Sequence, residues 1–385
     1  MIYETVRPRW MTDEVVMVGD MARRFFAAEF VPNIDRWRQQ GCIDRSLWAA
    51  AGAAGLLGAS LPEQYGGGGS RAFMAMVLLE QGRAGDSSWG LSVHEYVTHY
   101  ILAFGTEEQK ARWLPRMITG DLIGAIALSE PNAGSDLKSI LTNAQRQGDA
   151  YVVNGQKTFI TNGQTANLIC VAAKTDPAAG AKGISLLMVE TDHTEGLRRG
   201  ERLHKIGLHA ADTSELFFDS MTVPEKNLLG DSEGQGFRQL MVQLGWERLS
   251  IALRSVGQAE YVIAATLAHV RARKAFGGTL FDLQNTQFKL AEAKTKAEAM
   301  RAFTYSCVDA LMQGGLDPAM AAMAKLFCTQ AINEIVDECL QLHGGYGFMD
   351  EYPVGRLYGD VRAGKIYGGS NEIMKLIIAR SLGAD

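Results

Sequence analysis

The sequence predicts an α+β protein of several domains, in which two helical parts flank a small β part. The chain has 385 residues, more than one compact core usually accommodates. Apolar residues recur at helical spacing in its first and last thirds, whereas the middle third carries short β-rich runs between turn residues. We therefore expect a helical domain over residues 1–122, a β-barrel or sandwich domain over 123–230 and a helical bundle domain over 231–385.

The N-terminal third has a mainly helical pattern from Thr12 to about Gly120. Met21, Phe25 and Phe30 recur at the spacing of one helix face. The stretch 61–70 contains four consecutive glycines and is expected to be a loop. It lacks the Lys-Ser/Thr pair of a phosphate-binding loop, so a plain surface turn is the better interpretation.

The middle third is expected to form an all-β domain. Asn154-Gly155 separates two β-rich runs and predicts a hairpin with a type I′ turn, because this dipeptide accepts positive φ angles. Residues 168–173, 184–190 and 215–218 add further strands.

The last third returns to long helices after a glycine-rich linker around Gly230 and Gly234. The stripe from Leu290 to Leu311 steps by alternating threes and fours, as in a bundle helix. Asp317 and Pro318 are typical of the N-cap and first turn of the next helix.

Composition excludes several classes of protein. The net charge of -5 disfavours a general nucleic-acid binder, which needs surplus Lys and Arg. Five scattered cysteines without a CxxC pair suggest neither a disulfide framework nor a metal site. Arg7 and Pro8 interrupt any apolar leader, and no run approaches the length of a membrane span, so we expect no membrane association and a cytoplasmic location.

Two segments are candidates for chemistry. The first, ALSEPNAGSDLKS from Ala127, leads from an apolar strand into a loop of small residues that lets backbone N–H groups approach a ligand. A β-turn capped by its own Ser and Asp side chains is an equal alternative. The second, QLHGGYGFMDEYPVGRLYGD over residues 341–360, also fits a helix C-cap at Gly344-Gly345 followed by a loop.

Together these segments resemble the signature motifs of the acyl-CoA dehydrogenase family, and the resemblance extends along nearly the whole chain. LPEQYGG, FGTEEQKARWLPRMITGD, NGQKTFITNG, ARKAFG, LQNTQFKLAE and IYGGSNEIMKLIIAR are similar to family segments in the family order. The resemblance implies a helical N-terminal domain, a middle β domain, a C-terminal four-helix bundle and FAD as cofactor.

The resemblance also implies the flavin contacts. Beside the flavin and the start of the substrate it puts Ile126, Leu128, Ser129, Gly134 and Ser135, with Phe159, Ile160 and Thr161 on the other side of the ring. The FAD diphosphate and adenosine would be held by Arg273, Phe276 and Gln284, together with Gln341, Leu342, His343, Gly344 and Gly345 of a neighbouring subunit. Arg273 has a suitable fork geometry for phosphate, although a solvated helix end is the common setting of such a residue.

The position of the catalytic base departs from the commonest family pattern. Many members carry a glutamate after a tyrosine just before the last helix, where this chain has Gly368. Glu247, in LMVQLGWERLSIA, matches the alternative base position of the long-chain and isovaleryl-type members. By itself the Glu247-Arg248 pair would be read as a solvated pair on a helix face, but the paired change at Gly368 favours catalysis by Glu247.

The remaining implied contacts surround the thioester. On the substrate side the resemblance puts Ser135, Arg238, Gly245, Trp246, Arg248, Gly368 and Gly369, although packing or a helix surface also explains several of these residues. Ser370, Asn371 and Glu372 are expected as polar flavin contacts, and Ser370 as a simple N-cap is equally economical.

These features lead to the expectation of an acyl-CoA dehydrogenase of fatty acid β-oxidation. It would oxidise a medium-chain, long-chain or branched acyl-CoA to the trans-2-enoyl-CoA and pass electrons to electron-transfer flavoprotein. A homotetramer built as a dimer of dimers is implied as well. A flavin-dependent oxidase or monooxygenase on the same fold is the first alternative, and a non-enzymatic scaffold the second.

Overall fold

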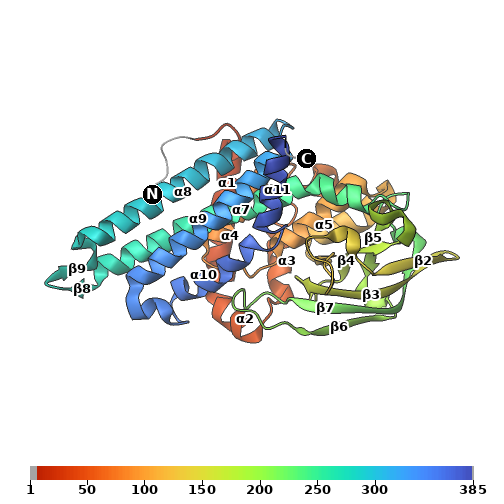
Figure 1. Cartoon of the computed structure of the whole chain (residues 1–385), viewed down its shortest axis with the longest axis horizontal. Coiled ribbons are helices and arrows are strands. Elements are labelled where there is room, and N and C mark those ends of the chain that lie inside the picture. Colours follow the sequence, from red (N-terminus) through yellow and green to blue (C-terminus); the bar gives the residue numbers. More distant parts are fainter. Residues whose placement is uncertain (1–6, 384–385) are drawn as a thin grey trace.

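The computed structural model describes residues 7–383 and places three parts of the chain side by side (Figure 1). The first part is built from helices whose termini are set by capping residues. Thr12 caps the first helix by accepting from the backbone N–H of Val15, and Thr106 with Gln109 forms a capping box. The helices of this part are α1 (Asp13–Phe25), α2 (Ile34–Gln40), α3 (Arg45–Ala53), α4 (Arg71–Arg83), α5 (Leu91–Phe104) and α6 (Glu107–Ile118).

The middle part is a curled seven-stranded sheet in the order β1-β4-β2-β3-β7-β6, with β5 paired to β4. Strands β1 and β4 are parallel, and most other pairs are antiparallel. The strands are β1 (Gly124–Ala127), β2 (Asn143–Gln147), β3 (Ala150–Ile160), β4 (Leu168–Lys174), β5 (Ile184–Glu190), β6 (Leu197–Arg202) and β7 (Ser214–Pro224).

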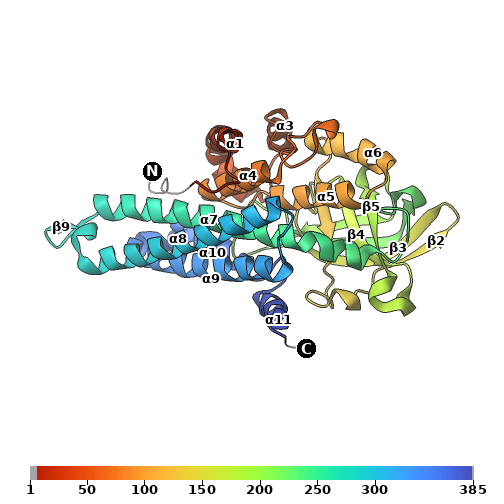
Figure 2. The same ribbon diagram turned by 90° about the horizontal axis from the view of Figure 1, so that it is seen from above.

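The C-terminal part is a bundle of long helices. Figure 2 shows the N-terminal helices on one side of α7 and α11 on the other. A short hairpin of β8 (Lys274–Ala275) and β9 (Gly278–Thr279) joins α7 to α8. The helices are α7 (Gly236–Ala272), α8 (Gln284–Met312), α9 (Pro318–His343), α10 (Pro353–Arg362) and α11 (Asn371–Ser381).

The predicted fold class is confirmed, and one local prediction is wrong. Asn154 and Gly155 do not form a hairpin turn. They lie inside β3, where Gly155 has φ 145° beside an irregularity in the register with β7. The turn of this hairpin lies at Gly148-Asp149, between β2 and β3. The predicted divisions at 122/123 and 230/231 fall in the connections from α6 to β1 and from β7 to α7.

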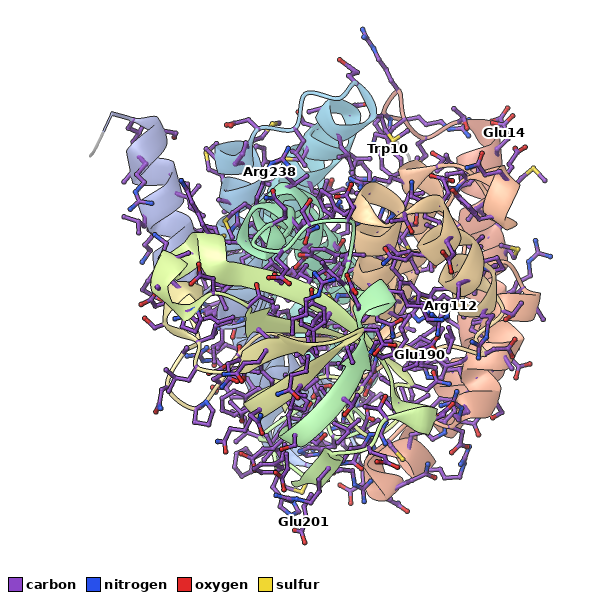
Figure 3. The ribbon with its side chains drawn as sticks, turned by 90° about the vertical axis from the view of Figure 1, so that its right-hand side faces the viewer. Trp10, Glu14, Arg112, Glu190, Glu201 and Arg238 are labelled. Atoms are coloured by element: carbon purple, nitrogen blue, oxygen red, sulfur yellow. The ribbon has the colours of Figure 1, made fainter. Side chains whose placement is uncertain are left out.

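Polar contacts join the N-terminal helices to the sheet. Arg112 of α6 pairs with Glu190 at the end of β5, and both are labelled in Figure 3. The indole N–H of Trp113 donates to the same carboxylate at 2.7 Å. These contacts fix α6 of the N-terminal part against the sheet.

Candidate active site

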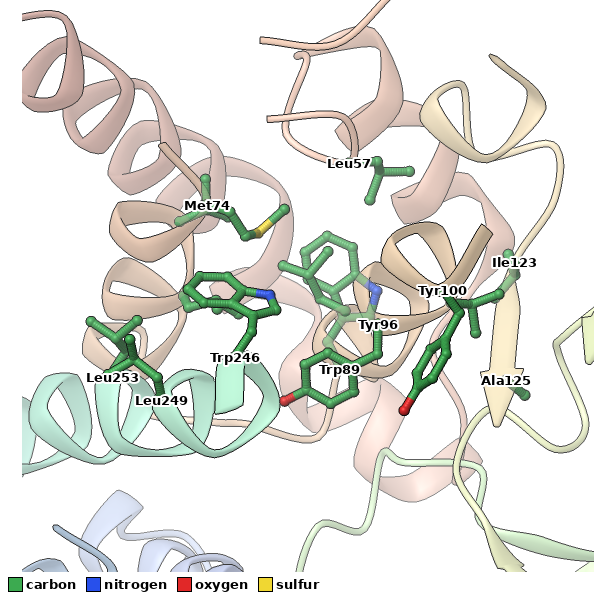
Figure 4. Close-up of a cluster of buried hydrophobic side chains, with 14 of the residues drawn as sticks. Leu57, Met74, Trp89, Tyr96, Tyr100, Ile123, Ala125, Trp246, Leu249 and Leu253 are labelled. Carbon is green, nitrogen blue, oxygen red and sulfur yellow. The ribbon is translucent and has the colours of Figure 1, made fainter. Parts of the chain in front are cut away.

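The carboxylate of Glu247 is buried on α7, with 8% of the residue exposed. The hydroxyl of Tyr100, from α5, donates to Oε1 of Glu247 at 2.7 Å. The hydroxyl of Tyr96 donates to the backbone oxygen of Glu247 at 3.2 Å. Figure 4 shows Tyr96 of α5 beside Trp246 of α7, with Tyr100 on the side toward β1. The alternative of a solvated surface pair is therefore wrong for Glu247.

Burial raises the pKa of Glu247 to about 7. The hydrogen bond from Tyr100 and the charge of Arg248 oppose this shift, and the charge of Glu95 adds to it. A carboxyl group with such a pKa exchanges its proton near neutral pH. This property is what a general base for a weakly acidic C–H needs.

Gly368 lies against the same face of α7, one helical turn beyond Glu247. A Cβ atom at position 368 would stand 2.4 Å from Cδ1 of Ile251, and the backbone there has φ +65°. Glu247 and Ile251 are four residues apart and so share one helix face. The side chain missing at position 368 and the carboxylate at position 247 thus border the same region of α7.

The first set of predicted flavin contacts is held together by a buried ion pair. Lys157 of β3 donates to Glu130 Oε1 at 2.8 Å and to the backbone oxygen of Leu128 at 2.9 Å. Burial lowers the pKa of Lys157 to about 8, although the charge of Glu130 opposes this shift. The amide of Thr158 donates to the oxygen of Ser129 at 2.9 Å. The loop after β1 and the end of β3 are therefore fixed to each other.

The residues at the end of β3 differ in how they meet solvent. Phe159 has φ 61° and is 70% exposed, so a strained backbone presents a bare aromatic ring to solvent. Ile160 is buried in the core, and any flavin contact from it would come from its backbone. Gly134 and Ser135 are exposed in the loop after β1, and Ile126, Leu128, Ser129 and Thr161 are partly exposed.

The second set of predicted FAD contacts lies elsewhere in the chain. His269 and His343 stack with ring centroids 4.2 Å apart, and the guanidinium of Arg273 lies 5.5 Å from the centre of the Tyr346 ring. The end of α7 and the end of α9 therefore meet. Figures 1 and 2 show the β8–β9 hairpin at this end of the bundle, remote from the sheet.

Side chains of this second set are presented outward. Phe276, at the β8–β9 turn, has φ 50° and is 92% exposed. Gln341, Gly344 and Gly345 are exposed as well, and Gly344 has φ 60° as the C-cap of α9. The two sets of predicted FAD contacts thus lie far apart in the folded chain. Their exposed residues are free to face another molecule.

The predicted substrate contacts occupy different settings. Trp246 is buried and donates from its indole N–H to Glu95 Oε2 at 2.7 Å, which makes it part of the core. Arg248 is 5% exposed, and its Nε atom has no hydrogen-bond partner among the described residues. Arg238 is exposed near the start of α7, where Figure 3 labels it, and Gly245 is partly exposed.

The start of α11 is fixed by a buried lysine. Lys325 of α9 donates to the backbone oxygen of Gly369 at 2.8 Å and to Asn371 Oδ1 at 2.9 Å. Burial, and then the charge of Arg248, lower the pKa of Lys325 to about 8. Ser370 caps α11 by accepting from the amide of Ile373, while Glu372 is exposed. The N-cap role considered for Ser370 is confirmed, and Asn371 is engaged within the chain.

Sequence reasoning missed Tyr100, Lys157 and Lys325. No local sequence motif predicts their polar contacts. The partner of Tyr100 is 147 residues away along the chain, that of Lys157 is 27 residues away and that of Lys325 is 46 residues away. A basic residue inside an otherwise apolar strand or helix is the one signal that points to Lys157 and Lys325, because a buried lysine needs acceptors.

Comparisons with known proteins decide the family. Three family models match: "Acyl-CoA dehydrogenase, N-terminal domain" over residues 12–121, "middle domain" over 125–221 and "C-terminal domain" over 234–383. The chain belongs to the acyl-CoA dehydrogenase family. It is 43% identical over 381 residues to the mitochondrial long-chain specific acyl-CoA dehydrogenase of Rattus norvegicus. The aligned region covers 98% of this chain and 88% of the relative.

Solved structures agree with this assignment. The crystal structure of an acyl-CoA dehydrogenase from Geobacillus kaustophilus superposes with a TM-score of 0.95 at 45% identity, covering 98% of this chain and all of the other. A glutaryl-CoA dehydrogenase from Mycobacterium smegmatis in complex with FADH2 gives a TM-score of 0.91 at 29% identity, covering 97% and 95% of the two chains.

As a member of the acyl-CoA dehydrogenase family, the chain is a flavoprotein oxidoreductase with FAD as its cofactor. A flavin takes stacking contacts and hydrogen bonds. The site offers both, with the exposed aromatic ring of Phe159 at the end of β3 and the hydroxyls of Ser129, Ser135 and Thr161. The loop after β1 that carries two of these hydroxyls is fixed to β3. Among residues 7–383, no helix is long and apolar enough to cross a membrane.

Proposed function

We propose that this acyl-CoA dehydrogenase converts an acyl-CoA thioester to its trans-2-enoyl-CoA, with Glu247 as the base. The observation that carries the proposal is the buried carboxylate of Glu247, whose pKa is raised to about 7 and which borders the region left open at Gly368. The substrate is proposed to be a medium-chain, long-chain or branched acyl-CoA.

The proposed reaction removes a proton and a hydride from neighbouring carbon atoms of the acyl group. Glu247 takes a proton from the carbon next to the thioester carbonyl, and FAD, when bound, supplies the acceptor for the hydride that leaves the next carbon. A matched general base contributes ~10²- to 10⁴-fold to such a step. A backbone N–H of the chain donates to the thioester oxygen and stabilises the developing enolate. Tyr100 holds one oxygen of Glu247 and leaves the other available for the substrate.

We propose further that two chains complete each FAD site. The residues of the β1 loop and the end of β3 would hold the flavin ring, and those around Arg273 and Gly344 of a neighbouring chain would hold the diphosphate and adenosine. The separation of the two sets within one chain and the exposure of Phe276 support this arrangement. A homotetramer satisfies it, and sedimentation analysis of the yellow protein tests it.

Substitution of the proposed base tests the function. Glu247→Gln should keep FAD and acyl-CoA binding, because the amide fills the same space, but should not bleach the flavin when acyl-CoA is added anaerobically. Glu334→Gln, which changes an exposed carboxylate of α9 paired with Lys296, should bleach at the wild-type rate. A Glu247→Gln protein that bleaches at a rate near that of the wild type would exclude Glu247 as the base.

The electron acceptor and the location are proposals of the same kind. We propose that electrons pass to electron-transfer flavoprotein and that the protein works in the cytoplasm in fatty acid β-oxidation. Reduced flavin should then persist in air and be reoxidised quickly by added electron-transfer flavoprotein. Fast reoxidation by oxygen alone would contradict this proposal.

A further inference from the structure

Arg254 is a buried cation of α7 that no carboxylate of residues 7–383 neutralises. The residue is 9% exposed, and its Nε atom has no hydrogen-bond partner among the residues that the structure describes. Its one hydrogen bond within residues 7–383 runs from Nη2 to the hydroxyl of Tyr367 at 3.2 Å, and its guanidinium lies 5.8 Å from the centre of that ring. No ion pair forms between Arg254 and any acid in the part of the chain that the structure describes.

Two partly buried arginines show what is missing. Arg38 is paired with Asp86 at 3.0 Å and with Asp360 at 3.2 Å. Arg83 is paired with Glu80 and Glu260. Burial of a charge is unfavourable unless an opposite charge and hydrogen bonds compensate it, and these two arginines follow that rule. The two arginines buried on α7, Arg248 and Arg254, form no such ion pair among the described residues, and we therefore expect the counter-charge of Arg254 to come from outside the chain.

Arg254 lies in line with the proposed base. Residues 247, 251 and 254 follow the spacing of one face of α7. Gly368 approaches this face at Ile251, and Tyr367, the neighbour of Gly368, contacts Arg254. On this face of α7, Arg254 therefore lies about 10 Å further along the helix axis than Glu247.

The stretch that faces α7 from Ser87 into the start of α5 adds hydroxyls without hydrogen-bond partners among the described residues. The hydroxyl of Ser87 accepts from Gln258 at 3.0 Å, and the hydroxyl of Tyr96 donates to the backbone oxygen of Glu247 at 3.2 Å, so residues 87–96 run along α7 in the opposite direction. Ser88 and Ser92 fall between these two contacts. Both are buried, and neither hydroxyl has a hydrogen-bond partner within the described chain.

We propose that Arg254, aided by Ser88 and Ser92, binds a carboxylate at the far end of the acyl group. The substrate class is then a medium-length ω-carboxyacyl-CoA, and Arg254 is a specificity-determining residue. The inference rests on the proposed function, because it takes Glu247 to mark the reacting end of the acyl chain. A plain alkyl chain would leave the guanidinium without a counter-charge and both hydroxyls without partners, which is unfavourable for binding.

Pairs of acyl-CoAs that differ only at the far end test the proposal. We would measure kcat/KM for octanoyl-CoA and suberoyl-CoA, and for hexanoyl-CoA and adipoyl-CoA, with the wild type, Arg254→Leu and Arg254→Lys. The wild type should prefer the carboxylated partner. Arg254→Leu should lower the ratio of carboxylated to alkyl kcat/KM by about 10- to 100-fold, and Arg254→Lys should keep part of the preference.

The ratio is insensitive to the amount of folded enzyme, since both substrates meet the same sample. Alkyl substrates that bleach the flavin while the ratio stays unchanged in Arg254→Leu would overturn the role of Arg254 and leave the proposed function intact. Failure of every acyl-CoA to bleach the wild type would instead overturn the proposed function, and the present inference with it. A wild type that rejects both carboxylated substrates but oxidises both alkyl ones would also overturn the inference.

Discussion

At the scale of single residues, the raised pKa of Glu247 connects chemistry with stability. The group has its ordinary value of 4.5 in the unfolded chain and a value of about 7 in the folded protein. The folded protein therefore holds the proton more tightly than the unfolded chain does. The contribution of the protonated Glu247 carboxyl group to the stability of the folded protein is complete below pH 4.5 and is lost as the pH rises through about 7.

Glu247→Gln should accordingly stabilise the protein at alkaline pH. The neutral amide keeps the hydrogen bond from Tyr100 and removes a buried charge, which is worth at most about 3 kcal/mol above pH 7. Thermal unfolding at pH 8 should give a higher Tm for the variant than for the wild type, and near pH 4 the two values should converge. A Tm difference that is the same at both pH values would show that Glu247 does not titrate in this range.

Tyr100→Phe should move the acid limb of the pH–rate profile. The hydroxyl of Tyr100 donates to the carboxylate and lowers the pKa of Glu247, so its loss raises that pKa and leaves less base at pH 6. The variant should therefore lose more kcat/KM at pH 6 than at pH 9. Tyr96→Phe is the matched control, because its hydroxyl donates to the backbone oxygen of Glu247 and not to the carboxylate. Equal losses at both pH values would contradict a positioning role for Tyr100.

The sequence led to Glu247 but not to its surroundings. The residues at positions 368 and 247 could be compared with the family pattern. This comparison outweighed the common interpretation of Glu247 and Arg248 as a solvated pair on a helix surface. The partners of Glu247 depend on how α5 packs on α7, and the tyrosine spacing on α5 carries no information about that. Arg254 illustrates the same limit, since its lack of a counter-charge is a property of the folded chain.

At the scale of elements, Gly368 sets how closely the segment before α11 approaches α7. Gly368→Ala should destabilise the protein by about 1–3 kcal/mol, because the residue has positive φ and the added Cβ would collide with Ile251. Ile251→Val removes the colliding Cδ1 atom, so the double variant should recover part of the loss in Tm. Gly315→Ala is the control, since its Cβ would make one ordinary contact, 3.8 Å from the oxygen of Ala310. A Gly368→Ala variant as stable as Gly315→Ala would refute the close approach.

The Lys157–Glu130 pair should matter for both the sheet and the cofactor. Lys157→Met leaves the carboxylate of Glu130 buried without its cation, and removal of one partner of such a pair typically costs about 3–5 kcal/mol. FAD affinity should fall together with Tm, because the β1 loop loses its anchor to β3. Combining Lys157→Met with Glu130→Gln should restore part of the Tm. Unchanged FAD affinity in a destabilised Lys157→Met protein would separate the pair from cofactor binding.

Elements were predicted well where their pattern was long and less well where local turn chemistry competed. The stripe on α8 and the β-rich run of β5 gave correct elements, because tertiary packing reinforces a continuous apolar face. Asn154-Gly155 failed as a turn because β3 is paired with β7 on both sides of this dipeptide, and long-range pairing outweighed the local preference.

At the scale of the whole molecule, Arg38 joins all three parts of the chain. It comes from α2 and contacts Asp86 after α4, His209 from the loop between β6 and β7, and Asp360 from α10. The backbone N–H of Leu208 donates to Asp360 as well. Burial, and then the charge of Asp86, raise the pKa of Asp360 to about 7, while Arg38 opposes the shift. No motif predicted this junction, since its members are up to 322 residues apart.

Arg38→Met should weaken the junction in a pH-dependent way. Without the guanidinium, two buried carboxylates repel each other, and the loss should be about 3–5 kcal/mol at pH 8. Loss of the guanidinium raises the pKa of Asp360 further, so this group takes up a proton as the pH falls and the loss of Tm should shrink by pH 5. Arg36→Met, two residues away in an exposed pair with Asp44, should change Tm little at either pH. A Tm loss that is the same at pH 5 and pH 8 would mean that the junction acts through packing of the arginine side chain and not through its charge.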